Sequence, residues 1–167
     1  PDIDEENYLR VIRYKTAKLF EAAGRLGAVI GGATEAQKDA LARYGMHLGT
    51  AFQLVDDVLD YSGDFLKTGK NIGDDLAEGK PTLPLLYAMK HGTPEQAARI
   101  REAIEHGGLT EFQSVLAAIK DTDALQYTRE QARHEIRIAN EAISILPDSN
   151  SKSALLQLAA FAVDRSF

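Results

Sequence analysis

The stretch QLVDDVLD, residues 53–60, decides the fold class because it closes a long run of helical character that begins at Thr34. The pattern predicts one unbroken helix from there to about residue 61. Thr34 and Gln37 form a capping-box pair at its start. Gly45 and Gly49 lower the helix propensity of the run, but they would let a neighbouring helix approach closely.

Four polar residues gather on one side of this expected helix. At about 100° per residue, Gln53, Asp56, Asp57 and Asp60 fall within about 100° of one another. The apolar residues that lie largely on the other side are Leu41, Leu48, Phe52, Val55 and Leu59. We therefore expect one face to pack while three carboxylates and an amide point together out of the other.

The charges of this acidic face favour a function. Asp56 and Asp60 are a like-charge pair four residues apart, which costs roughly a few tenths of a kcal/mol, whereas a solvated face usually mixes Glu with Lys. Asp is also a poor residue for a helix interior, and no Lys or Arg lies between Arg43 and Lys67 to offset the repulsion. We expect a bound cation here, with an ordinary solvated face as the alternative.

The ligand chemistry of the acidic face selects the kind of cation. Oxygen ligands without His or Cys favour a hard ion such as Mg²⁺. Mg²⁺ usually combines about one or two carboxylates with substrate phosphates and water, so we expect a diphosphate to complete the site. Helical di-iron bundles need Glu-x-x-His pairs, which this sequence lacks. The four histidines are too scattered to share a metal and are interpreted as structural or surface residues: His47, His91, His106 and His134.

Nearly all the remaining sequence is also predicted to be helical, so the fold class is all-α, with a single domain over residues 1–167. A helix over about residues 4–23 precedes a break at residues 24–33, and residues 62–80 form a long Gly-rich loop of a kind that is often functional. Asp74 and Asp75 in that loop either join a site or start a helix. Further helices are expected over about residues 82–92, 94–107 (with a Thr93–Gln96 capping box), 110–120, 123–146 and 151–163.

The bulk composition excludes several classes of function. The chain has 167 residues and a formal net charge of −6, which argues against a nucleic-acid binder because that function needs a basic surface. It has no cysteine, so disulfides and thiolate metal sites are ruled out. No apolar run approaches the roughly 20 residues that span a bilayer, and no signal peptide is visible. These features fit a cytoplasmic protein.

Four short motifs, in this order, resemble those of the trans-type polyprenyl (isoprenyl) diphosphate synthases. Lys15-Thr16-Ala17 resembles the KTA element, and FQLVDDVLDY, residues 52–61, resembles the second aspartate-rich motif. Thr68-Gly69-Lys70 resembles the TGK element, and EGKPTLP, residues 78–84, resembles a segment of medium- and long-chain members. The sequence is most similar to bacterial octaprenyl diphosphate synthases. This resemblance implies the C-terminal half of an isoprenoid synthase fold, an antiparallel helix bundle.

The resemblance implies a prenyl transfer. An allylic diphosphate such as farnesyl diphosphate ionises to a carbocation, isopentenyl diphosphate attacks it, and a proton is lost. Asp56 would coordinate Mg²⁺ at the allylic diphosphate, and Asp57 and Asp60 would support that metal directly or through water. The other residues with implied roles are Lys15 and Lys70 at the diphosphate, Thr16 and Gln53 beside the carbocation, and Lys80 as a more distant support.

The sequence also departs from the family pattern. Full-length members carry a first aspartate-rich motif and a Gly-Lys-Arg element that binds isopentenyl diphosphate, and neither occurs here. Because these two elements are missing, we expect the lone chain to be inactive. For the full-length protein, the resemblance implies a homodimer that makes a lipophilic product, such as octaprenyl diphosphate for quinone side chains. Two alternatives remain: a non-catalytic partner subunit, against which the intact motifs argue, and a class I terpene cyclase, whose second metal motif usually mixes Asn, Ser or Thr, and Glu.

Overall fold

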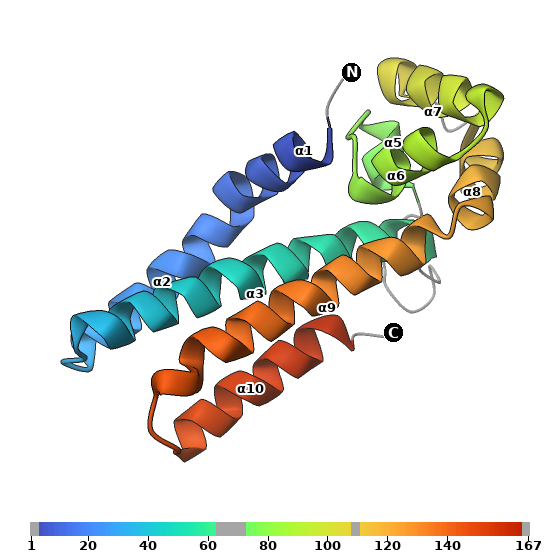
Figure 1. The fold of residues 1–167 in the computed structure, drawn as a ribbon. Coiled ribbons are helices and arrows are strands. Elements are labelled where there is room, and N and C mark those ends of the chain that lie inside the picture. Colours follow the sequence, from blue (N-terminus) through green and yellow to red (C-terminus); the bar gives the residue numbers. More distant parts are fainter. Residues whose placement is uncertain (1–3, 63–72, 108–110, 165–167) are drawn as a thin grey trace. The chain divides into compact units, whose positions relative to one another are not determined.

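The computed structural model describes residues 4–62, 73–107 and 111–164 (Figure 1). These ranges contain helices and no strand, which confirms the all-α prediction. None of the helices in them is long and apolar enough to cross a membrane. The α-helices are α1 (Glu5–Ile12), α2 (Lys18–Ile30), α3 (Glu35–Ser62), α5 (Asp74–Ala77), α6 (Leu83–His91), α7 (Pro94–His106), α8 (Phe112–Asp121), α9 (Ala124–Ala142) and α10 (Asn150–Val163). A π-helical turn (Arg13–Ala17), called the π turn below, joins α1 to α2, and a 3-10 turn (Ile143–Ile145) follows α9.

The ends of α3 and α7 follow from local chemistry. Thr34 Oγ1 accepts a hydrogen bond from Gln37 N over 3.3 Å, and Gln37 Oε1 accepts one from Thr34 N over 3.0 Å. These two bonds satisfy backbone donors that a helix start leaves unpaired. Thr93 and Gln96 make the same capping box before α7, and Gly107, which follows its last residue His106, lies in the left-handed region with φ 65°. Both predicted capping boxes are confirmed.

The predicted break at residues 24–33 begins later than expected, because α2 continues to Ile30 and only residues 31–34 separate it from α3. Gly24 lies against α3, where an added Cβ would be 2.2 Å from a backbone oxygen. From the α3 side, a Cβ at Gly45 would likewise be 2.2 Å from the backbone oxygen of Phe20. The small residues therefore mark a close contact between two helices rather than the end of one of them. The expectation that Gly45 permits such an approach is confirmed.

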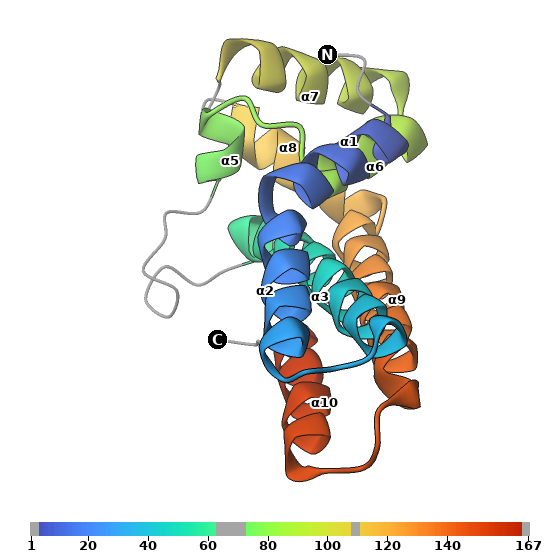
Figure 2. The same ribbon diagram turned by 90° about the vertical axis from the view of Figure 1, so that its left-hand side faces the viewer.

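Contacts divide the chain into two compact units. The described part of unit 1 is residues 4–8, 56–62, 73–107 and 111–129, and that of unit 2 is residues 9–55 and 130–164. In unit 1, α6, α7 and α8 pack against one another around buried residues such as Leu85, Ile100 and Val115. In unit 2, α3 runs back beside α2, and α10 runs back beside α9 (Figures 1 and 2). The single domain over residues 1–167 stays a prediction.

Candidate active site

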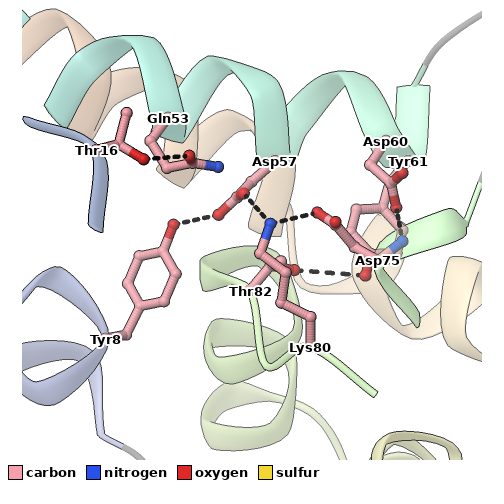
Figure 3. Close-up of polar contacts among 9 residues, drawn as sticks. All are labelled: Tyr8, Thr16, Gln53, Asp57, Asp60, Tyr61, Asp75, Lys80 and Thr82. Atoms are coloured by element: carbon pink, nitrogen blue, oxygen red, sulfur yellow. Dashed lines mark hydrogen bonds and ion pairs between the residues drawn. The ribbon is translucent and has the colours of Figure 1, made fainter. Parts of the chain in front are cut away.

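Asp57, near the C-terminal end of α3, is the centre of a buried polar cluster in unit 1 (Figure 3). The residue is fully buried, with 0% of its surface exposed. The Tyr8 hydroxyl donates a hydrogen bond to Asp57 Oδ2, and Lys80 Nζ donates one to Asp57 Oδ1 over 3.4 Å. Each carboxylate oxygen therefore has a donor, which lowers the cost of removing a charge from water.

Lys80 ties Asp57 to Asp75. Its Nζ also donates a hydrogen bond to Asp75 Oδ2 over 3.0 Å, so one ammonium group serves two carboxylates (Figure 3). Burial alone would lower the pKa of Lys80, but the charges of Asp57 and Asp75 and its hydrogen bonds to them outweigh burial and raise that pKa. The preceding Gly79 has φ 68°, a conformation that glycine adopts easily and that turns the chain just before the lysine.

Asp60 connects the end of α3 to the start of α5. Its Oδ2 accepts a hydrogen bond from Asp75 N over 3.2 Å, and its backbone oxygen accepts one from Gly73 N over 3.0 Å. Burial, together with the nearby charge of Asp75, raises the pKa of Asp60 to about 7. Behind this contact, Thr82 Oγ1 donates a hydrogen bond to the buried Tyr61 hydroxyl over 3.4 Å.

The expectation that three carboxylates point together out of one helix face needs correction. Asp57 and Asp60 are 0% and 7% exposed, whereas Asp56 is half-buried. Within residues 4–62, 73–107 and 111–164, no group of three or more Asp, Glu, His or Cys could hold a metal ion. Helix angles describe one helix, and they do not show that Tyr8 and Lys80 approach Asp57 from other segments.

The carboxylate oxygens of the acidic face still suit a hard cation, but fewer of them are accessible to it than expected. Asp56 is half-buried, so its carboxylate is the most accessible of the three. Asp57 and Asp60 already accept hydrogen bonds from other residues of the cluster. A single carboxylate agrees with the way Mg²⁺ is usually bound, through about one or two carboxylates with substrate phosphates and water.

The other predicted site residues lie in unit 2 or outside the described residues. Thr16 Oγ1 donates a hydrogen bond to Gln53 Oε1 over 3.3 Å, which joins the π turn to α3. Lys15, which lies in the π turn just before Thr16, is exposed. Lys70 lies outside the described residues. The structure thus pairs Thr16 with Gln53, and Lys80 with Asp57.

Sequence reasoning missed Tyr8 and left Asp75 open. The sequence carried one signal for Tyr8: it stands four residues before Ile12, the spacing of a single helix face, and a tyrosine on a face that packs usually needs a partner for its hydroxyl. For Asp75 the helix-start interpretation is confirmed, because the residue lies in the first turn of α5. Its contact with Lys80 makes it part of the cluster, while its role in a site stays a prediction.

Comparisons with known proteins agree with the motifs. The family model of the polyprenyl synthetases matches residues 1–121. The octaprenyl diphosphate synthases of Haemophilus influenzae and Escherichia coli are 56% and 53% identical over 100% and 99% of this chain, which covers 51% of each. A polyprenyl synthase from Caulobacter crescentus, crystallised with calcium and isoprenyl diphosphate, has a TM-score of 0.92 at 40% identity, over 98% of this chain and 51% of that one. The chain thus spans about half the length of these relatives. The resemblance is confirmed, and the chain belongs to the polyprenyl synthetase family.

Proposed function

We propose that this chain is the allylic-diphosphate-binding half of a trans-polyprenyl diphosphate synthase. The complete enzyme would add isopentenyl diphosphate units to an allylic diphosphate, such as farnesyl diphosphate, and release a long-chain product such as octaprenyl diphosphate. The observation that carries the proposal is the contact of Lys80 with Asp57, because it joins the DDVLD motif to the EGKPTLP motif. The octaprenyl diphosphate synthases of Haemophilus influenzae and Escherichia coli, each more than half identical to this chain, support the product class.

The proposed reaction requires positive charge at the leaving diphosphate. Asp56 would hold Mg²⁺, which would neutralise negative charge on the departing diphosphate when bound. By resemblance to the KTA and TGK elements, Lys15 and Lys70 would also act on the diphosphate. Calcium in the crystal of the Caulobacter crescentus relative supports a divalent cation, and Mg²⁺ is our choice because its preferred ligands are carboxylate and phosphate oxygens.

The buried carboxylates would act as supports in this proposal. Tyr8 and Lys80 hold Asp57, and that contact would set the orientation of the last turns of α3, where Asp56 lies. Asp60 holds α5 through Asp75 N. Because groups held in this way are already oriented, they need not move when charge develops on the diphosphate.

Thr16 and Gln53 would stabilise the allylic carbocation. Their hydrogen bond holds a hydroxyl oxygen and an amide oxygen close together. The hydroxyl and the amide carbonyl are dipoles whose negative ends, the oxygens, favour a nearby positive charge. Both oxygens are weak nucleophiles, so they would not capture the cation. The proposal also includes a homodimer of the complete enzyme in the cytoplasm, with its product used for quinone side chains.

A turnover assay of the full-length polypeptide that carries this chain tests the function. The polypeptide is incubated with Mg²⁺, farnesyl diphosphate and labelled isopentenyl diphosphate, and the products are separated by chain length. Asp56→Ala should lower kcat by about 100-fold or more, whereas the control Asp148→Ala, at an exposed aspartate whose side chain is 100% accessible, should not. Wild-type turnover in Asp56→Ala would overturn the metal assignment. A wild-type polypeptide that makes no polyprenyl product would instead favour the partner subunit.

A further inference from the structure

Glu135 on α9 connects three segments of unit 2. Its side chain is only 8% exposed, and its Oε1 accepts a hydrogen bond from Arg13 Nη2 over 3.1 Å. Its Oε2 is hydrogen-bonded to His47 Nδ1 on α3. Arg13 is the first residue of the π turn. One buried carboxylate therefore joins α9, α3 and the π turn.

The charges of Arg13 and His47 keep Glu135 ionised. Burial alone would raise the pKa of Glu135, but its hydrogen bond to His47 and the charges of His47 and Arg13 outweigh burial and lower that pKa. The carboxylate is therefore charged at neutral pH, and its contact with Arg13 is a charge-assisted hydrogen bond. Exposed ion pairs contribute little to stability, but loss of a partner here would leave a buried charge poorly compensated.

The segment that Glu135 holds is unusual. π-helical turns are rare, and they occur frequently at functional sites. The π turn is fixed at its first residue by the contact of Arg13 with Glu135, and near its last residue by the hydrogen bond of Thr16 to Gln53. Lys15 lies between these two attachments. The side chains of Arg13 and Thr16 are attached on either side of it, while Lys15 itself is exposed.

We propose that Glu135 is a positioning residue, which holds Arg13 and thereby fixes the π turn that carries Lys15 and Thr16. Glu135 acts through Arg13 and does not itself contact substrate. The consequence for catalysis rests on the function proposed above. Supporting residues that orient a catalytic group typically contribute about 10- to 100-fold, so loss of Glu135 should lower kcat by about 10-fold or more.

Hydrogen exchange of the chain itself tests the positioning role without any substrate. Glu135→Gln keeps the shape of the side chain and removes its charge, and Arg13→Gln removes the other partner. Each should speed exchange of the amides of residues 13–17 by about 10-fold or more relative to amides in α10, and the double variant should add little, because the two residues act as one unit. The control Asp39→Asn, which breaks the exposed Arg25–Asp39 pair over 2.8 Å in the same unit, should leave these amides unchanged.

The outcomes separate this inference from the proposed function. Uniform acceleration throughout unit 2 in Glu135→Gln, or none in residues 13–17, would overturn the positioning role. Turnover of the full-length polypeptide then tests the catalytic consequence: Glu135→Gln should lower kcat, and Glu135→Asp should recover part of it. Unchanged turnover in Glu135→Gln would reject that consequence even if residues 13–17 exchange faster. A wild-type polypeptide without turnover would overturn the proposed function alone, and the exchange result would still decide the role of Glu135.

Discussion

Lys80 Nζ and Asp57 Oδ1 lie 3.4 Å apart, although the two residues are 23 positions apart in the sequence. The lysine side chain is 27% exposed and the aspartate side chain 0% exposed, so the carboxylate depends on this contact more than the ammonium group does. Breaking an ion pair that has one fully buried member costs more stability than breaking a surface pair, because it leaves a buried charge uncompensated. The contact therefore supports both the stability of unit 1 and the proposed site.

Replacement of Lys80 by Met should destabilise the chain. The Asp57 carboxylate would keep Tyr8 as a donor but lose the positive charge of Lys80. We expect a loss of about 2–4 kcal/mol in the free energy of unfolding, close to the range for a broken buried pair. Urea unfolding measures this change, with Lys120→Met at an exposed position of α8 as the control. Equal losses in the two variants would show that the Asp57 contact contributes nothing.

Replacement of Tyr8 by Phe should cost about 1–3 kcal/mol, because it removes the second donor to a buried carboxylate. The matched control is Tyr14→Phe, at a tyrosine that is 71% exposed. Tyr8 and Lys80 share Asp57 as a partner, so the Tyr8→Phe Lys80→Met double variant should deviate from additivity. Additive losses in urea unfolding would indicate that the two donors act independently.

Local chemistry made the fold class and the starts of α3 and α7 predictable. The Thr34–Gln37 and Thr93–Gln96 capping boxes depend on residues three positions apart, so the sequence contains all the information that they need. The break expected at residues 24–33 was placed too early, because Gly24 permits the close approach of α3 and does not end α2.

The burial of the aspartates could not be predicted in the same way. Helix angles place Asp56, Asp57 and Asp60 on one side of α3, but exposure depends on which segments cover that side. Tyr8 lies 49 positions from Asp57 and Lys80 lies 23 positions away. The motifs identified Asp57, Asp60 and Lys80, whereas Tyr8 lies outside all four motifs.

The stability of the metal-free chain should fall as the pH rises from about 4 to about 7 through the titration of Asp60. Burial and the charge of Asp75 raise the pKa of this residue to about 7 in the folded chain, while its pKa in the unfolded chain is about 3.9. The folded state therefore binds the proton more tightly, and its advantage is lost as the proton dissociates. Urea unfolding in the presence of EDTA should show a contribution of about 2–4 kcal/mol from this group.

Asp60→Asn provides the control for this titration. The amide has approximately the same shape and cannot ionise, so the component of the pH dependence that belongs to Asp60 should disappear. An unchanged pH dependence in Asp60→Asn would assign the effect to other groups. A carboxyl carbon resonance of Asp60 that titrates near pH 4 by NMR would contradict the raised pKa directly.

Two Gly→Ala replacements in unit 2 should have opposite effects on stability. Alanine favours a helix over glycine by about 1 kcal/mol, but a Cβ at Gly45 would lie 2.2 Å from the backbone oxygen of Phe20, so α2 and α3 would have to separate. Gly45→Ala should therefore cost about 1–3 kcal/mol, as overpacked sites do. At Gly27 nothing lies within 4 Å of the added Cβ, so Gly27→Ala should stabilise by about 0.5–1 kcal/mol. Stabilisation by both replacements in urea unfolding would mean that α2 and α3 are not in close contact at Gly45.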